Sequence, residues 1–135
     1  VTTALKMGTL ITLLLATISF VILVTFKLPI IEAFNTAHSA QLVSYARVGL
    51  PIYFTSTFFS TLNLLFILFL TAINAARASF TLSILRGYVI LLPAILILAA
   101  MVGINGVWSA VPVTEFLVCI IASLLVRQRI KQFNA

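Results

Sequence analysis

The sequence predicts an all-α integral membrane protein with four transmembrane helices. The chain has 135 residues, is 63% hydrophobic and is only 7% charged, whereas a soluble domain carries about 25% charged residues. Its apolar residues form long runs, which are typical of spanning helices and not of the alternating strands of a membrane barrel. We therefore treat residues 1–135 as a single transmembrane region.

The first predicted helix covers about residues 7–26, between Lys6 and Lys27. At about 1.5 Å per residue it can cross about 30 Å of hydrocarbon. Small residues share one of its faces: Thr9, Thr12, Ala16 and Ser19. Such a face is typical of close packing against another helix, and the lining of a cavity is the alternative. The polar segment that follows is expected outside the hydrocarbon, with Asn35 capping a helix that begins at Thr36.

The second predicted helix covers about residues 48–76 and is longer than one span requires, so tilt or an interfacial extension is expected. Polar residues fall close to one stripe along it: Ser56, Ser60, Asn63 and Asn74. Amides in hydrocarbon need hydrogen-bond partners. Two interpretations of the stripe stay open, namely hydrogen bonding between helices and the wall of a polar cavity.

The third and fourth predicted helices cover about residues 87–102 and 107–126, and a short Gly/Asn turn joins them. Pro93 lies inside the third helix and Pro112 inside the fourth. An internal proline frees a backbone carbonyl and bends the helix. These two prolines are therefore hinge candidates.

The distribution of positive charge predicts the orientation of the helices. One side of the membrane would hold Lys6, Arg77, Arg86, Arg127, Arg129 and Lys131. The other side would hold Lys27 and Arg47. The positive-inside rule then makes both ends of the chain cytoplasmic. We interpret the net charge of +6 as topology information, so no nucleic-acid partner is expected.

Glu115 is the carboxylate that the prediction places near the bilayer midplane. A charge at that depth costs about 2.5–3.5 kcal/mol on insertion scales. No arginine or lysine is expected at the same depth, so Glu115 is either protonated or faces water or a cation. Both states make it a candidate for Na⁺ or H⁺ coupling. The alternative is a buried, protonated acid that hydrogen-bonds a neighbouring helix.

Enzymatic and metal-binding functions find little support in the composition. The chain has one cysteine, Cys119, and one histidine, His38, so no disulfide and no metal-ligand cluster is expected. A second acid at membrane depth and a glycine-rich phosphate loop are also missing from the sequence. We expect no enzyme, no metal and no cofactor beyond a coupling ion.

Three sequence motifs resemble the multidrug and toxic compound extrusion (MATE) family. Arg86-x6-Pro93 followed by Gly103-Ile104-Asn105-Gly106-Val107-Trp108-Ser109-Ala110-x-Pro112-x2-Glu115 resembles the last two helices of that family. The exit Ala72-Ile73-Asn74-Ala75-Ala76-Arg77 and the entry Tyr45-Ala46-Arg47-x3-Pro51 resemble the ends of its tenth helix. One departure is Ala75, where many members have glycine.

The resemblance implies a piece of the carboxyl lobe, helices nine to twelve, of a twelve-helix, two-lobe transporter in the plasma membrane. Such a protein expels cationic, amphipathic compounds in exchange for Na⁺ or H⁺, and the remainder of the transporter would be the partner of this segment. In that setting Ser56, Ser60 and Asn63 would line the cavity, and Glu115 would face the cation. A self-contained four-helix assembly module without transport and a related lipid-linked-sugar or polysaccharide flippase are the alternatives.

Overall fold

The computed structural model describes residues 2–134, and every regular element in that range is a helix. In chain order the elements are α1 (Thr2–Thr25), α2 (Lys27–Phe34), α3 (Ala40–Phe54), α4 (Ser56–Ala72), α5 (Ala76–Ile84), the π-helical turn η1 (Leu85–Val89), α6 (Leu91–Val102) and α7 (Ile104–Asn134). They form four helical segments that are long and apolar enough to cross a membrane, which confirms the predicted fold class.

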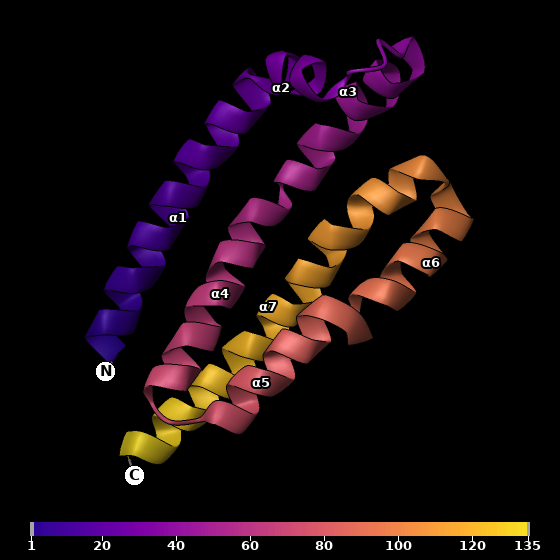
Figure 1. Ribbon diagram of the computed structural model, residues 1–135. Coiled ribbons are helices and arrows are strands. Elements are labelled where there is room, and N and C mark those ends of the chain that lie inside the picture. Colours follow the sequence, from indigo (N-terminus) through magenta and orange to yellow (C-terminus); the bar gives the residue numbers. More distant parts are fainter. Residues whose placement is uncertain (1, 135) are drawn as a thin grey trace.

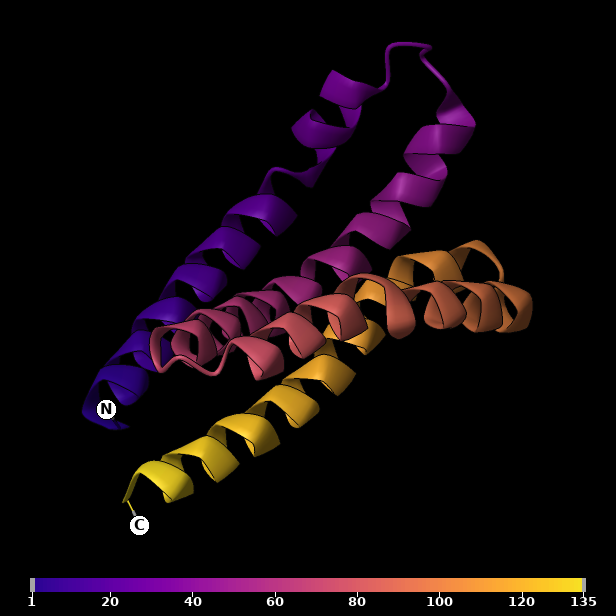
Figure 2. The ribbon, with the colours of Figure 1, turned by 60° about the horizontal axis from the view of Figure 1, so that its bottom comes forward.

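The fourth span, α7, is the element around which the others are arranged (Figure 1). It packs against α6, α4 and α3, whereas α1 packs mainly against α4. Both termini lie at the same end of the molecule as the α4–α5 turn, and the α2–α3 connection lies at the other end (Figures 1 and 2). This arrangement agrees with the alternating topology predicted from the sequence.

The small-residue face of α1 serves helix packing at its centre. Ala16 is almost fully buried, and Gly8 lies close to the side chain of Leu65 in α4. Ser19, by contrast, is exposed. The helix begins at Thr2, a turn and a half before the predicted start, because the residues before Lys6 continue the same helical hydrogen bonding.

The connection after α1 contains an additional short helix, α2, which the sequence did not predict. The predicted cap is also wrong, because Ser39 and not Asn35 begins the next helix. The Ser39 hydroxyl accepts a hydrogen bond from the Leu42 N–H, at 3.3 Å. The Asn35 side chain instead ends α2 and accepts from the Ser39 N–H, at 2.9 Å. Both side chains satisfy backbone groups that helix ends leave free.

The second span is broken into two helices. Thr55 separates α3 from α4, and its N–H bonds the Ile52 carbonyl in a tighter turn at 3.2 Å. Pro51 lies inside α3, and the N–H that it lacks concerns the turn before it. At the break itself two hydroxyls bond back to the chain: Thr55 donates to the Ile52 carbonyl at 2.6 Å, and Ser56 donates to the Tyr53 carbonyl at 2.6 Å. Such local side-chain bonds compete with regular helical hydrogen bonding. The span ends at Ala72, so the predicted end at residue 76 is too late. Asn74 lies in the turn with φ +63°, a conformation that asparagine tolerates.

The third span differs most from its prediction. It begins at Ala76 and not at Gly87, because α5, η1 and α6 form one continuous membrane segment. The π-helical turn is closed by the Ile90 N–H bonding the Leu85 carbonyl at 3.0 Å. Pro93 lies four residues after Val89 and cannot donate to the Val89 carbonyl, which accounts for the irregular turn at this place. Arg86 is thereby carried into the span.

A single residue turns the chain from α6 into α7. Gly103 has φ +67° and ψ −138°, a conformation open to glycine and strained for other residues. Gly106 lies inside α7 and not in the predicted turn; a Cβ there would overlap the Leu98 carbonyl of α6. The fourth helix runs from Ile104 to Asn134, well beyond the predicted 107–126, and continues through Pro112 without a break.

The buried core joins the second, third and fourth spans near the end that carries the termini. Its members are aliphatic residues of α4, α5 and α7, which we call the aliphatic cluster: Leu70, Ala78, Leu82, Val118, Ala122 and Val126. Four of them, Leu70, Leu82, Val118 and Ala122, are fully buried. This cluster holds in place the helices that carry the polar site described next.

Candidate functional site

Glu115 lies on the buried face of α7. Ala110, Thr114 and Val118 recur at intervals of four residues and are all buried, so they mark the stripe of α7 that faces the other helices. Glu115 sits beside this stripe, and its side chain is 7% exposed. Its carboxylate is therefore held between helices and not turned toward the surroundings of the bundle.

Arg86 forms an ion pair with Glu115. Its Nε donates to Glu115 Oε1 at 2.6 Å, and its side chain is 29% exposed. This contact contradicts the prediction that no basic residue reaches the depth of Glu115. Arg86 is the eleventh residue of the third span, about 15 Å from its start at the helical rise. The prediction is wrong because a basic residue beside an apolar run usually marks the end of a span, whereas Arg86 lies inside one.

A signal for the correct assignment is present in the sequence. A helix over residues 87–102 would be only about 24 Å long, which is short of the roughly 30 Å of hydrocarbon. The helix therefore has to begin earlier, and the only continuous extension includes Arg86. Once Arg86 lies in the span, it becomes the natural partner of a carboxylate at similar depth.

Asn63 is the third member of the site and comes from α4. Its Nδ2 donates to Glu115 Oε2 at 2.7 Å and to the Glu115 backbone carbonyl at 2.8 Å. Asn63 is fully buried, and its Oδ1 makes no hydrogen bond to any residue that the structure describes. For Asn63 the structure bears out the interpretation of hydrogen bonding between helices. We call Asn63, Arg86 and Glu115 together the polar cluster.

The polar cluster is electrically balanced. Removing an ion from water costs several kcal/mol even in a real protein, so an isolated carboxylate would be unstable here. Each carboxylate oxygen of Glu115 instead accepts one hydrogen bond, from Arg86 and from Asn63 respectively. Both states expected from the sequence assumed that no basic side chain reaches Glu115. The structure replaces them with an ion pair, in which the partner of the carboxylate is the Arg86 guanidinium.

A cavity of about 400 Å³ opens beside the ion pair. It is lined by Arg86 and Glu115 together with Leu64, Ile67, Ser83 and Leu91. Leu64 and Ser83 are themselves exposed, so the cavity opens on the outer side of α4 and α5. A small ion with its water has room to approach the carboxylate from this side.

The other predicted cavity residues do not join the polar cluster. Ser56 donates to the Tyr53 carbonyl at 2.6 Å, and Ser60 donates to the Thr57 carbonyl at 3.4 Å. Both hydroxyls thus bond the preceding turn of their own span. Asn74 lies exposed in the α4–α5 turn, beside a small surface cavity that Arg129 also lines. The predicted stripe is therefore reduced to Asn63 at this site.

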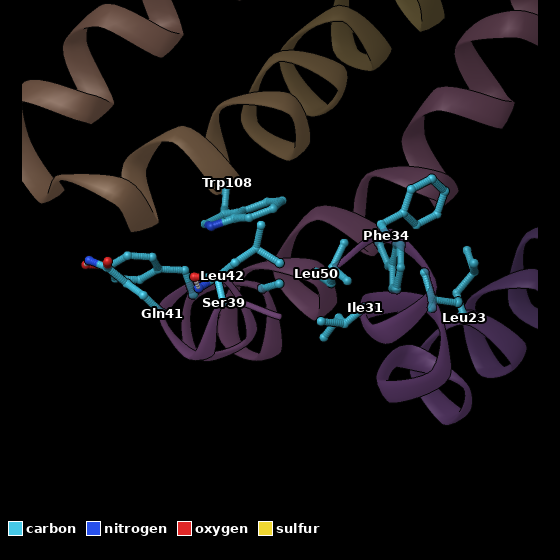
Figure 3. A pocket seen from close by; sticks show the side chains of 12 residues that line it. Leu23, Ile31, Phe34, Ser39, Gln41, Leu42, Leu50 and Trp108 are labelled. Carbon is cyan, nitrogen blue, oxygen red and sulfur yellow. Dashed lines mark hydrogen bonds between the residues drawn. The ribbon is translucent and has the colours of Figure 1, made fainter. Parts of the chain in front are cut away.

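A second, larger hollow lies near the opposite end of the molecule from the termini. This apolar groove has a volume of about 640 Å³ and is walled by α1, α2, α3 and the start of α7 (Figure 3). Aromatic side chains contribute much of its lining: Phe34, Tyr45, Phe54 and Trp108. Trp108 lies directly against Gly49, where any side chain would overlap the indole. This contact seats the start of α7 on α3.

The described residues contain no group of three or more histidine, cysteine, aspartate or glutamate side chains that could hold a metal ion. No protein-family model, curated protein or solved structure matches the chain. The interpretation of the site therefore depends on its geometry, its chemistry and the sequence motifs that surround it.

Proposed function

We propose that this chain forms the last four helices of a MATE-type antiporter, which expels cationic, amphipathic compounds in exchange for Na⁺ or H⁺. The observation that carries the proposal is Glu115, a carboxylate held at membrane depth between Arg86 and Asn63. An exchanger of cations needs an intramembrane carboxylate whose partner can change, and acids at this depth generally mark ion or substrate pathways.

The motif residues give further support, since they meet one another in the fold. Arg86 pairs with Glu115, Gly106 permits the close approach of α7 to α6, and Trp108 packs on Gly49. Pro93 follows the π-helical turn that carries Arg86. Arg86 and Glu115, which lie 29 positions apart in one motif, are thus in direct contact, and the other two contacts join a motif residue to a neighbouring helix.

We place both ends of the segment in the cytoplasm and the protein in the plasma membrane. Because Arg86 is now assigned to the span, the end with the termini keeps five positive charges: Lys6, Arg77, Arg127, Arg129 and Lys131. Lys27 and Arg47 remain at the other end. The bias still favours cytoplasmic termini under the positive-inside rule. The remaining helices of the transporter are the proposed partners of this segment within the bilayer.

The proposal is tested by exchange in liposomes that contain the purified full-length protein. Efflux of ethidium, a fluorescent amphipathic cation, is followed under an imposed Na⁺ or H⁺ gradient. Glu115→Gln keeps the size of the side chain and removes its charge, so we expect gradient-driven efflux to fall at least tenfold. Glu32→Gln, a change at an exposed position on α2, is the matched control and is expected to leave efflux unchanged.

Two results would contradict the proposal. One is a wild-type protein that moves no ethidium under either gradient. The other is a Glu115→Gln protein whose efflux keeps both its rate and its ion dependence. A protein that instead moves a lipid-linked sugar, and no cation, would favour the flippase alternative.

A further inference from the structure

The two partners of the ion pair are buried to different degrees. The Glu115 side chain is 7% exposed and the Arg86 side chain is 29% exposed, and both line the adjoining cavity. Here the carboxylate is fixed inside the bundle, and the guanidinium reaches it from the side on which the cavity opens.

The contact between the two groups is also a single one. Arg86 uses Nε alone, and its two terminal nitrogens make no hydrogen bond to any residue that the structure describes. Arginine and carboxylate groups often form two parallel hydrogen bonds, which hold both groups more firmly. Asn63, in contrast, donates two hydrogen bonds to Glu115, one to the carboxylate and one to the backbone carbonyl. The carboxylate therefore keeps one firm partner if the arginine leaves.

We propose that Arg86 is a tethered cation that competes with the coupling ion for Glu115. In the unloaded state the guanidinium neutralises the carboxylate, and a small monovalent cation, H⁺ or Na⁺, displaces it into the cavity. This inference rests on the proposed function, because it assigns the site at which the exchanged ion acts. It adds the identity of the group that holds the carboxylate when the ion is absent.

The backbone around Arg86 can accommodate this exchange of partners. Arg86 lies in η1, where the wider π-type hydrogen bonding gives the helix an irregular turn. The next residue is Gly87, and a Cβ built on it would meet no atom within 4 Å. A change in the hydrogen bonding of this turn would move Arg86 while α5 and α6 stay in place. Such irregular turns are common at functional sites.

Charge balance explains why the competition would produce exchange. With Arg86 on Glu115 the polar cluster is neutral, and a cationic compound meets no net repulsion there. With an ion on Glu115 the guanidinium is free and positive, because arginine keeps its charge in proteins. A free positive charge in a medium of low dielectric disfavours a second cation nearby. Ion and cationic substrate would then occupy this region in alternation.

The groups that face Glu115 are few. Arg86 comes from η1, the neutral amide of Asn63 comes from α4, and Cys119 lies one turn further along α7. Arg86 is the charged member of this set, so its removal isolates the competition.

The inference is tested by the reactivity of Glu115 toward dicyclohexylcarbodiimide, which modifies protonated carboxyl groups and not carboxylates. The purified full-length protein is labelled at neutral pH, and the Glu115 peptide is quantified by mass spectrometry. We expect Arg86→Gln to be labelled at least ten times faster than wild type, because the carboxylate has lost its cation and takes up a proton. Arg77→Gln, an exposed position on the same span, is expected to match wild type.

Adding Na⁺ distinguishes the two candidate ions, and adding methylguanidinium tests whether a cation beside Glu115 protects it from labelling. In Arg86→Gln, replacing choline with Na⁺ slows labelling if Na⁺ is the competing ion and leaves it unchanged if H⁺ is. In Arg86→Ala, methylguanidinium is expected to restore slow labelling, since it supplies the missing cation. Equal labelling of wild type, Arg86→Gln and Arg77→Gln would overturn the inference.

A second measurement uses the wild-type protein, so it does not depend on the folding of a variant. Phenylglyoxal modifies free guanidinium groups, and Arg77 serves as the internal reference. Competition predicts that Arg86 reacts faster relative to Arg77 as Na⁺ is raised or as the pH is lowered. A constant ratio across both series would contradict it.

The labelling experiments need no transport, so they can fail independently of the efflux assay. If wild type moves no ethidium but Glu115 is labelled faster in Arg86→Gln, the proposed function alone is overturned. If efflux is normal and Glu115 labelling is the same in wild type and Arg86→Gln, this inference alone is overturned.

Discussion

The polar cluster and the aliphatic cluster join the same three spans by different physical means. Glu115 and Val118 are one turn apart on α7, and Leu82 lies one turn before Arg86 on the third span. The polar cluster uses three directional contacts to Glu115 from Arg86 and Asn63. The aliphatic cluster uses close packing of buried side chains. Packing holds helices together in any charge state, whereas the polar contacts require the charges of Arg86 and Glu115.

The difference indicates that the two clusters have separate roles, with the aliphatic cluster holding the spans together and the polar cluster responding to ions. Between helices in lipid, association comes mainly from van der Waals packing and from hydrogen bonds, because the tails around them are equally apolar. Packing at the end with the termini can keep the spans in register while the polar contacts change partners. Substitutions in the two clusters should therefore have separable effects on stability and on ion dependence.

The largest effect on stability is expected from Leu82→Ala in the aliphatic cluster. Leu82 is fully buried, and its truncation would leave a cavity that costs roughly 2–5 kcal/mol. Unfolding in mixed micelles measures this loss, and carbodiimide labelling of Glu115 is expected to stay at the wild-type rate. Leu96→Ala, at a position 71% exposed on the same span, is the matched control with little expected change. Altered Glu115 labelling in Leu82→Ala would show that the two clusters are not separable.

Asn63→Leu should have a smaller effect on stability and a clear effect on ion dependence. The change keeps the side chain's approximate size and removes both hydrogen bonds to Glu115, which are worth about 1–2 kcal/mol in a membrane. It also releases the carboxylate from its fixed position, so the ion concentration for half-maximal efflux should change. Ser60→Ala is the control, because that hydroxyl bonds only its own helix turn. Identical ion dependence in Asn63→Leu and Ser60→Ala would argue against a fixed carboxylate.

Pro93→Ala is expected to have the smallest effect on stability and a visible effect on rate. The new N–H can donate to the Val89 carbonyl, which favours regular helix over the π-helical turn. We expect ethidium efflux to slow several-fold while the protein still inserts and stays folded. Pro112→Ala is the comparison, since α7 is continuous there. An unchanged efflux rate in Pro93→Ala would remove the proposal that the turn moves.

The fold was largely predictable, because hydropathy and length dictate where apolar runs cross a bilayer. The elements that were missed depend on contacts that no local pattern contains. Helix α2 and the Ser39 cap arise from the geometry of the connection, and the break at Thr55 lies within one apolar run whose hydropathy gives no sign of it.

The site was half predictable for a related reason. A single acid at membrane depth drew attention to Glu115, and the need of an amide for a partner drew attention to Asn63. Arg86 was assigned to the surface, because an unpaired charge in hydrocarbon is unfavourable and charges usually mark the ends of spans. Its pairing with Glu115 joins residues 29 positions apart, and only the shortness of the predicted 87–102 helix points to it in the sequence.

The most direct test of this account is the protonation state of Glu115 in the wild-type protein. Infrared difference spectroscopy of the full-length protein against Glu115→Gln, at neutral pH and without substrate or Na⁺, detects the carbonyl stretch of a protonated carboxyl group. The account predicts no such band from Glu115 in wild type, because Arg86 holds it as a carboxylate, and predicts its appearance in Arg86→Gln. A protonated-carboxyl band that is present in wild type and lost in Glu115→Gln would contradict the ion pair at the centre of the proposal.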